Sequence, residues 1–205
     1  MKHLLRTSLS FILDTDPASR TKWGVIFTYP GFQILVFYKV AHALWRSKWH
    51  GLASFIMFLG RWITGVEIHP GATIKGPLFI DHGMGAVIGE TAIIGSHVVM
   101  YHNVTLGGIT GDKDKRHPTI GDHVIIGAGA CILGDITIGN HAKVGANAVV
   151  IKDVSEKDTV VGVPARSVSC KKSVQFMPYG MPNPKDCPDL QSQIDELREL
   201  LNKNS

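Results

Sequence analysis

The sequence predicts a mainly β protein: a parallel β-helix with an α-helical cap at its N-terminal end and a loop and helix at its C-terminal end. Three observations predict this fold. An aliphatic or Met residue recurs at every sixth position through the middle of the chain, Gly often follows it, and a small or β-branched residue often stands four positions after it. Neither an α-helix, with 3.6 residues per turn, nor an alternating strand has a period of six. Short extended runs joined by corners do have it.

The periodic positions lie in three blocks. Thirteen residues occupy them: Ile68, Ile74 and Ile80; Ile88, Ile94, Met100 and Leu106; and Ile120, Ile126, Ile132, Ile138, Val144 and Val150. We expect these side chains to point into the interior of stacked coils that span residues 66–168. We also expect the glycines that follow many of them to allow a backbone conformation that a Cβ would resist. These are Gly89, Gly95, Gly121, Gly127, Gly139 and Gly145.

A stack of coils leaves its ends uncovered, so caps are expected. We predict that residues 1–65 form the N-terminal cap, with two helices over residues 31–45 and 52–62, which are apolar, rich in aromatics and free of internal Pro. The first residues of the chain are a basic start and a short apolar stretch. Asp14 and Asp16 follow that stretch at once and no small-residue cleavage site is seen, so we do not interpret it as a signal peptide.

The repeat ends at residues 163–165, and residues 169–205 are predicted to form a loop followed by a helix. Residues 177–189 are rich in Pro and Gly, which is typical of a loop. From Asp189, which can act as an N-cap, apolar residues recur in steps of four, three and four, at Leu190, Ile194, Leu197 and Leu201. The pattern indicates an amphipathic helix, too short to stand alone, that serves self-association or docking rather than ligand binding.

Composition excludes several classes of protein. The 205 residues are 44% hydrophobic and 19% charged, which excludes a disordered or fibrous chain, and a net charge of +4 without a long charged run does not indicate a nucleic-acid partner. No apolar stretch is long enough to span a bilayer. The three cysteines, Cys131, Cys170 and Cys187, form no CxxC pair, so we expect unpaired thiols in a reducing cytoplasm. No set of His, Cys and carboxylates has metal-ligand spacing, and no metal is predicted.

The two breaks in the repeat collect the candidate catalytic residues. The first break contains Asp81 and His82, and the second contains Arg116 and His117. A His beside a carboxylate at an exposed corner suits a general base, because imidazole titrates near neutral pH, and Glu67 could hold its other nitrogen. The residues alone leave alternatives open: Asp81 as the cap of a turn, Glu67 as a solvated corner residue, and His117 as an ordinary loop residue.

These residues lie in runs that carry a resemblance. The runs EIHP (67–70), DHGMG (81–85), IGET (88–91), VTLGG (104–108), RHP (116–118), IGAGA (126–130) and GVPAR (162–166) resemble the serine O-acetyltransferases of the hexapeptide-repeat acyltransferase superfamily, over about residues 14–168. IGAGA and GVPAR fit many members of the superfamily, whereas DHGMG and RHP joined by TLGG are much more specific. Asp16-Pro17-Ala18 resembles the serine-binding motif of the family.

The resemblance implies a left-handed β-helix that transfers acetyl from acetyl-CoA directly to the hydroxyl of L-serine, without an acyl-enzyme. It implies that His82 is the general base and that Glu67 orients it. Asp16 and Asp81 would face the ammonium group of serine, and Arg116 with His117 its carboxylate. The pantetheine arm and the nucleotide phosphates of acetyl-CoA would lie along five further residues: Gly107, Gly108, Ala128 and Ala146 for the arm, and Lys143 for the phosphates.

The resemblance also implies a homotrimer with active sites between neighbouring chains. The helical region is short compared with that of members that pair trimers into hexamers, so a trimer is favoured and a hexamer stays open. The chain has Tyr101-His102-Asn103 where Gln is expected before VTLGG. Cysteine is isosteric with serine and is expected to inhibit. The remaining histidines of the repeat are interpreted as surface or structural: His69, His97, His102, His123 and His141.

Two other functions stay open. One is acetyl transfer to a sugar or another small hydroxyl acceptor by the same base, which would not need Asp16, Asp81 and Arg116 to hold a zwitterion. The other is a catalytically silent binding subunit. In the family, docking onto a cysteine synthase uses a C-terminal Ile, whereas this sequence ends in Asn202-Lys203-Asn204-Ser205.

Overall fold

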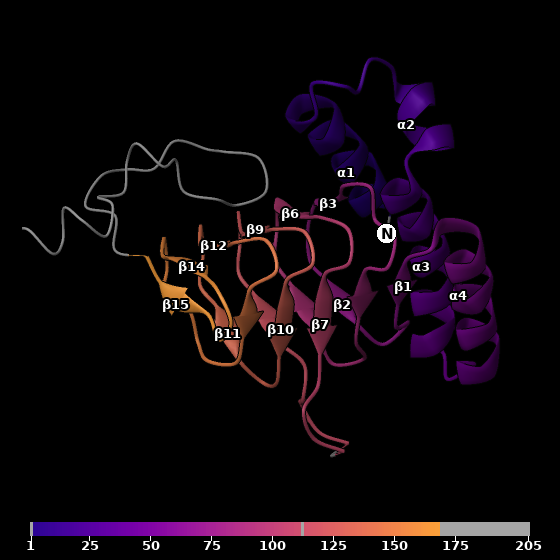
Figure 1. Ribbon diagram of the computed structural model, residues 1–205. Coiled ribbons are helices and arrows are strands. Elements are labelled where there is room, and N and C mark those ends of the chain that lie inside the picture. Colours follow the sequence, from indigo (N-terminus) through magenta and orange to yellow (C-terminus); the bar gives the residue numbers. More distant parts are fainter. Residues whose placement is uncertain (1, 112, 169–205) are drawn as a thin grey trace, which may run out of the picture.

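The computed structural model describes residues 2–111 and 113–168 (Figure 1). Four helices come first: α1 (Lys2–Thr15), α2 (Lys22–Thr28), α3 (Pro30–Arg46) and α4 (His50–Thr64). Short strands then wind into a solenoid that extends away from α3 and α4 (Figure 1). The loop and helix predicted for residues 169–205, together with Cys170 and Cys187, lie outside the described residues.

Three sheets form the sides of the solenoid, and the chain visits them in turn. The first sheet contains β1 (Glu67–Ile68), β4 (Val87–Ile88), β7 (Thr105–Gly107), β10 (Cys131–Leu133) and β13 (Val149–Val150). The second contains β2 (Thr73–Ile74), β5 (Ile93–Ile94), β8 (Thr119–Ile120) and β11 (Thr137–Ile138). The third contains β3 (Leu78–Ile80), β6 (Val98–Met100), β9 (Ile125–Ile126), β12 (Lys143–Val144), β14 (Thr159–Val161) and β15 (Arg166–Ser167). The pairings are parallel except β14 with β15, so the predicted parallel β-helix is confirmed.

The six-residue period is confirmed as the interior of the coils. Twelve of the thirteen periodic residues are buried, and Ile74, in the first coil, is half-buried. The register places them above one another: Ile88 pairs with Ile68 on one side and with Leu106 on the other. Each coil therefore adds one layer of aliphatic side chains to a continuous core.

The reason given for the repeat glycines is wrong. Among the described residues, none of these glycines has a positive φ. They are required because successive coils are close: a Cβ on Gly95 would lie 2.7 Å from the carbonyl oxygen of Gly121, and one on Gly139 would lie 2.5 Å from the backbone nitrogen of Glu156. The left-handed conformation occurs instead at the corners, at Gly85, Asn103, Gly129 and Asn147.

The two predicted N-terminal helices are confirmed as α3 and α4, but α1 and α2 were not predicted. α3 and α4 cover the open end of the coils, because Leu35 and Met57 join the same core as Ile68. α1 and α2 form a second core on the outer side of the third sheet, where Phe79, Val99 and Ile125 point away from the solenoid interior; Ile12 and Val25 pack there. Leu5, Leu9 and Ile12 of α1 do have helical spacing, but they lie in the stretch considered only as a signal peptide, and α2 has only 7 residues.

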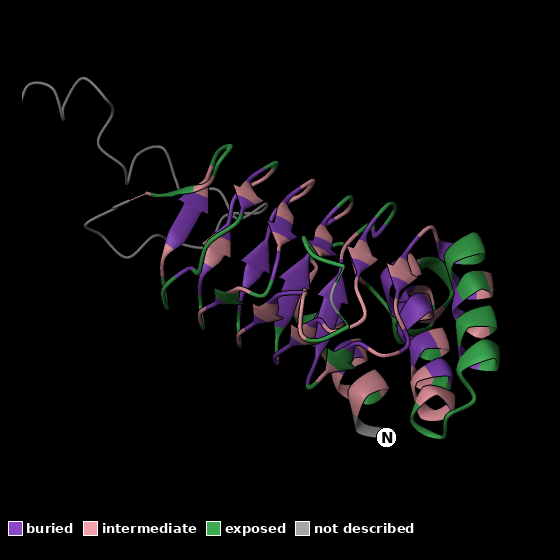
Figure 2. Cartoon of the chain, turned by 90° about the horizontal axis from the view of Figure 1, so that it is seen from below, coloured by how far each residue is buried: buried purple, intermediate pink, exposed green. Residues whose placement is uncertain are grey.

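The outward side of α4 is apolar and exposed (Figure 2). Phe55 and Phe58 stack there with ring centroids 6.4 Å apart, and Trp62 is 80% exposed. Of the helices in the described ranges, none alone has the length and apolar character to cross a membrane; α2 and α3 meet those criteria only as a pair bent by 74°.

Candidate active site

The strands of the first sheet end in a row of turns on either side. We call these two rows edges, and the predicted site residues divide between them. At one edge, the turns after β3, β6, β9 and β12 lead from the third sheet into the first; we call this the His82 edge. At the other edge, the turns after β4 and β7 lead from the first sheet into the second; we call this the His117 edge. The two breaks in the repeat therefore extend from opposite sides of one sheet.

The His82 edge begins with Asp81 and His82, directly after β3. His82 adopts a left-handed conformation with φ of 59°, and 62% of its side chain is exposed. Its Nε2 lies 3.7 Å from Oδ2 of Asp81, which is too far for a hydrogen bond but close enough for electrostatic attraction. Burial raises the pKa of the Asp81 carboxyl, and His82 partly opposes that shift. The imidazole is thus open to a reactant while the carboxyl beside it is half-buried.

The helical cap brings Asp16 to the same place. Asp16 follows the last residue of α1, and its Oδ1 accepts a 2.8 Å hydrogen bond from the N–H of Ala18. Its Oδ2 accepts a 2.6 Å hydrogen bond from the hydroxyl of Tyr29. Burial and this carboxylate raise the pKa of Tyr29 to about 12. Since Asp16 also raises the pKa of Asp81, the two carboxyl groups share one electrostatic environment.

Close packing fixes Tyr29 there. Gly31, at the start of α3, lies so close to β3 that a Cβ on it would stand 2.0 Å from the carbonyl oxygen of Ile80. The chain just before Gly31 therefore passes beside Asp81. Tyr29 was not predicted as a site residue, and nothing in its sequence context distinguishes it from other aromatics of the cap.

Glu67 lies on β1, the first strand of the first sheet. Within the described residues its carboxylate forms an ion pair with Arg61, 2.9 Å from Nη1, rather than with His82. The side chain is 46% exposed. Its role in orienting His82 stays a prediction.

His102 lies in the next turn of the His82 edge. Its ring is 5.8 Å from that of His82, centroid to centroid, at an angle of 73°. Its Nδ1 is the buried side-chain polar atom without a hydrogen-bond partner in the part of the chain that the structure describes. The sequence predicts a surface or structural role for His102. The repeat places His102 one coil above His82, and this position could have marked it as a candidate site residue.

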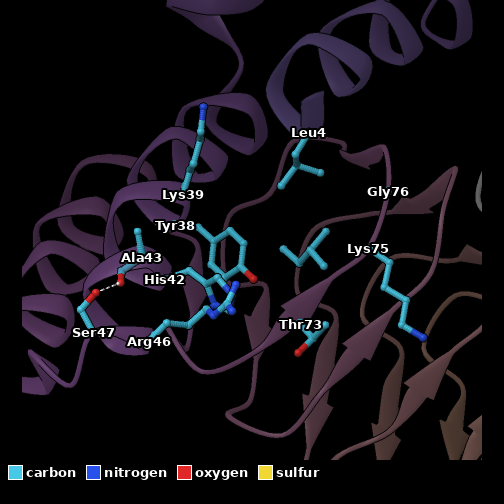
Figure 3. A pocket seen from close by; sticks show the side chains of 11 residues that line it. Leu4, Tyr38, Lys39, His42, Ala43, Arg46, Ser47, Thr73, Lys75 and Gly76 are labelled. Atoms are coloured by element: carbon cyan, nitrogen blue, oxygen red, sulfur yellow. Dashed lines mark hydrogen bonds between the residues drawn. The ribbon is translucent and has the colours of Figure 1, made fainter. Parts of the chain in front are cut away.

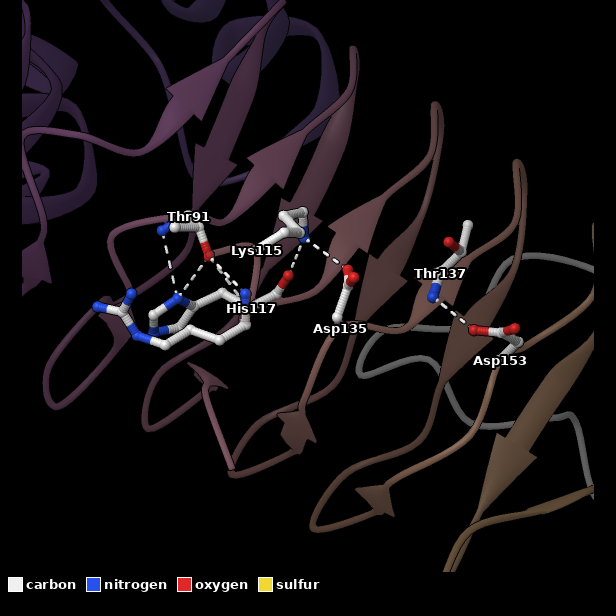
Figure 4. Close-up of polar contacts among 7 residues, drawn as sticks. Thr91, Lys115, His117, Asp135, Thr137 and Asp153 are labelled. Atoms are coloured by element: carbon white, nitrogen blue, oxygen red, sulfur yellow. Dashed lines mark hydrogen bonds and ion pairs between the residues drawn. The ribbon is translucent and has the colours of Figure 1, made fainter. Parts of the chain in front are cut away.

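Arg116 and His117 lie at the His117 edge, at the end of the long loop after β7 (Figure 4). Nη2 of Arg116 pairs with Oε2 of Glu90 at 2.5 Å, and this contact holds the pKa of Glu90 below its usual range. His117 is buried, and burial lowers its pKa, with the charge of Arg116 acting in the same direction. Lys115 donates to the carbonyl oxygen of His117 and pairs with Oδ1 of Asp135 at 3.1 Å (Figure 4). The edge thus holds an arginine and a histidine in fixed positions, and burial favours the neutral form of the histidine.

The residues predicted to contact acetyl-CoA also divide between the His82 edge and the His117 edge. Ala128 and Ala146 lie at the His82 edge, where backbone hydrogen bonds join successive turns. The N–H of Gly129 donates to the carbonyl oxygen of His102, and the N–H of Asn147 donates to that of Ala128. Lys143 lies on β12 beside that edge, and burial lowers its pKa. Gly107 and Gly108 lie at the His117 edge. Small residues of both edges thus leave backbone accessible on either side of the first sheet.

A cavity of about 610 Å³ lies elsewhere, between α3 and β2 (Figure 3). Tyr38, His42 and Arg46 of α3 line one side, and Thr73 and Lys75 the other. None of the predicted site residues lines it. In the described ranges, no group of three or more His, Cys, Asp or Glu side chains is placed to hold a metal ion.

Comparison with known proteins identifies the family. Residues 117–152 match the family described as bacterial transferase hexapeptide (six repeats). The chain is 50% identical to the serine acetyltransferase of Helicobacter pylori strain J99 over 80% of this chain and 96% of the relative. It is 48% identical to that of Bacillus subtilis strain 168 over 97% of this chain and 94% of the relative.

A solved structure agrees with the sequence relatives. Serine acetyltransferase of Neisseria gonorrhoeae in complex with serine superposes with a TM-score of 0.77 at 40% identity, over 80% of this chain and 67% of that one. The solenoid is therefore the left-handed parallel β-helix of the hexapeptide-repeat acyltransferases, and the resemblance stated from the sequence is confirmed. With this fold and these relatives, the chain belongs to the serine acetyltransferase family.

Proposed function

We propose that the protein transfers the acetyl group of acetyl-CoA to the hydroxyl of L-serine, giving O-acetyl-L-serine and CoA. One observation carries the proposal: the two edges of the first sheet present different groups, two carboxyl groups at one edge and a guanidinium with an imidazole at the other. Asp16 and Asp81 at the His82 edge suit an ammonium group, and Arg116 with His117 at the other edge suits a carboxylate. A zwitterionic amino acid requires both, whereas a sugar requires neither.

The chain's own residues account for the proton transfers. His82 accepts the proton of the serine hydroxyl as its oxygen attacks the carbonyl carbon of the thioester. The carbon–sulfur bond then breaks, and the protonated His82 returns the proton to the leaving thiolate. In this proposal Glu67 stabilises the charged imidazole, and Asp81 binds substrate. No acyl-enzyme is needed, because donor and acceptor are held together.

The active site requires more than one chain. Within one chain the His82 edge and the His117 edge lie on opposite sides of the first sheet, so we infer that the groups that hold one serine molecule come from neighbouring chains. A homotrimer that sets the His82 edge of one chain against the His117 edge of the next would complete three sites. Pairing of trimers through the exposed apolar side of α4 would give a hexamer, and the mass in solution by light scattering distinguishes the two.

Acetyl-CoA is proposed as the co-substrate, with its pantetheine arm along Ala128 and Ala146 and its phosphates near Lys143. A cytoplasmic location is proposed because the odd number of cysteines, without CxxC spacing, suits a reducing compartment. Cysteine, with a thiol in place of the hydroxyl, is expected to compete with serine.

The first experiment measures release of free CoA from acetyl-CoA with L-serine and with a panel of sugars and other amino acids. We expect release that depends on L-serine and is abolished in His82→Ala. Release with a sugar alone would replace the proposal by a sugar acetyltransferase. No release with any acceptor, from a folded oligomer, would favour a binding subunit.

The second experiment tests the shared site. We expect His82→Ala and His117→Ala chains to be inactive alone. After denaturation, mixing in equal amounts and refolding, about a quarter of sites should hold one intact copy of each histidine. Activity near that fraction of refolded wild type supports sites between chains. Persistent inactivity of the mixture, with wild type recovering, contradicts them.

A further inference from the structure

The run Gly89-Glu90-Thr91 follows β4 at the His117 edge. All three residues contact the Arg116–His117 segment, although 25 to 28 positions separate the partners in sequence. Glu90 holds the guanidinium of Arg116, as described above. The proposed reaction gives no role to Thr91, whose contacts are more numerous.

The hydroxyl of Thr91 makes all of its hydrogen bonds with this segment (Figure 4). Its Oγ1 accepts from the backbone N–H of Arg116 at 3.0 Å and from that of His117 at 3.1 Å. A hydroxyl has two acceptor positions and one proton. With both acceptor positions occupied, the proton points to the remaining neighbour, Nδ1 of His117, at 2.9 Å.

A second donor meets the same nitrogen. The backbone N–H of Thr91 donates to Nδ1 of His117 at 3.2 Å, and a backbone N–H cannot accept. Nδ1 is therefore an acceptor without a proton of its own, so the neutral ring carries its proton on Nε2. Burial lowers the pKa of His117, which favours this neutral form over the imidazolium.

The ring is also held from its other side. It lies against the bare backbone of Gly89, where a Cβ would stand 2.0 Å from Cδ2 and 2.1 Å from Nε2. Hydrogen bonds on Nδ1 thus fix the tautomer, and the packing of the ring against Gly89 fixes the orientation of the imidazole.

We propose that Thr91 is a positioning residue that holds His117 as the Nε2–H tautomer, a neutral hydrogen-bond donor for the carboxylate of L-serine. The kinetic part of this inference rests on the proposed function. It separates the two histidines by role: a ring nitrogen that already carries a proton cannot accept another, so His117 is a donor and His82 is the base.

The tautomer is measured first, without serine or acetyl-CoA. Long-range ¹H–¹⁵N spectra of protein labelled with ¹⁵N-histidine distinguish the two neutral tautomers, and the loss of one signal in His117→Asn assigns the ring. We expect the Nε2–H tautomer for His117 between about pH 6.5 and 8. Proton on Nδ1 in the wild type overturns the inference, whatever reaction the protein catalyses.

Kinetics of Thr91 variants test the role. Thr91→Val removes the hydroxyl at nearly constant shape, and should raise KM for serine about tenfold with a smaller change in kcat. The share of the Nε2–H tautomer should fall without vanishing, because the backbone N–H of residue 91 still donates to Nδ1. Thr91→Ser should restore both. The matched control is Thr137→Val on β11, because Thr137 bonds Asp153 through its backbone N–H, at 2.7 Å, and not through its hydroxyl (Figure 4).

The outcomes separate the two proposals. Unchanged tautomer and unchanged KM in a folded Thr91→Val protein overturn the positioning role. An equal rise of KM for serine in Thr91→Val and Thr91→Ser also overturns it, because the serine variant keeps the hydroxyl. Lack of serine-dependent activity in the wild type overturns the proposed function instead, and the spectra of His117 still decide its tautomer.

Discussion

The hydroxyl of Tyr29 donates a 2.6 Å hydrogen bond to Oδ2 of Asp16, and this contact joins the end of α1 to the start of α3 within electrostatic reach of Asp81. Asp16 has its other oxygen bonded to the N–H of Ala18, so both carboxylate oxygens are directed by the protein. A carboxylate held in this way keeps its orientation before a substrate ammonium group arrives, and binding then costs less conformational entropy.

Tyr29→Phe should therefore weaken serine binding. The variant removes a hydrogen bond to a charged acceptor, worth about 1.5 kcal/mol or more, so we expect KM for serine to rise about tenfold with kcat little changed. Steady-state kinetics at saturating acetyl-CoA measure both. Tyr38→Phe is the matched control, because the hydroxyl of Tyr38 donates to the carbonyl oxygen of Ala72 at 2.6 Å, in the core where α3 packs against the first coil. It should lower stability and leave KM unchanged; equal kinetic effects of the two variants would contradict the role given to Tyr29.

Gly89→Ala should damage the site more than the fold. The added methyl group would overlap the ring of His117. To make room the ring has to rotate, and Nδ1 then loses its hydrogen bonds from the N–H and the hydroxyl of Thr91. We expect serine-dependent kcat/KM to fall at least about tenfold, while far-ultraviolet circular dichroism and the oligomer mass stay those of the wild type.

Gly51→Ala provides the comparison, since nothing lies within 4 Å of a Cβ at Gly51. It is near the start of α4 and should be neutral or stabilising by up to about 1 kcal/mol. A Gly89→Ala enzyme as active as Gly51→Ala would show that the His117 ring does not need its present place.

The solenoid could be predicted because each coil repeats one interior environment, so Ile88 and Leu106, like Ile132 and Val150, meet the same need 18 residues apart. The helix α1 could have been predicted from the helical spacing of Leu5, Leu9 and Ile12, whereas its packing surface, the outward side chains of the third sheet, shows no local period. The site is divided in the same way. His82 and His117 stand out as breaks in the repeat, whereas Tyr29 and Thr91 gain their importance from partners 13 and 26 residues away.

The repeat interpretation predicts where the free energy of folding resides. Ile126→Ala removes a fully buried side chain from the middle of the stack, and should lower the free energy of unfolding by about 2–5 kcal/mol. Ile151→Ala, one residue past the periodic position Val150, changes a side chain that is 50% exposed and should cost about 0.5 kcal/mol or less. Denaturant titration at one protein concentration measures both, because assembly contributes to stability. Similar losses from the two changes would contradict the inward direction of the periodic residues.

Burial of His117 predicts a dependence of stability on pH. The pKa of His117 in the folded protein is below 6.5, its usual value, because burial disfavours the charged ring. Between these two pKa values the unfolded chain binds a proton that the folded chain does not, so the free energy of unfolding decreases as the pH falls from about 6.5. The slope from this one group is at most about 1.4 kcal/mol per pH unit.

His117→Asn isolates that contribution. Asn offers an oxygen where Nδ1 accepts from Thr91, and it does not titrate. The free energy of unfolding of the variant should therefore depend less on pH below about pH 6.5 than that of the wild type. Burial also lowers the pKa of His69, and His69→Asn should remove a second part of this dependence. The double variant should show the flattest profile of the four proteins. Unfolding curves collected at constant protein concentration across this range provide the measurement, and a wild-type slope that persists in the double variant would mean that other groups set the acid stability.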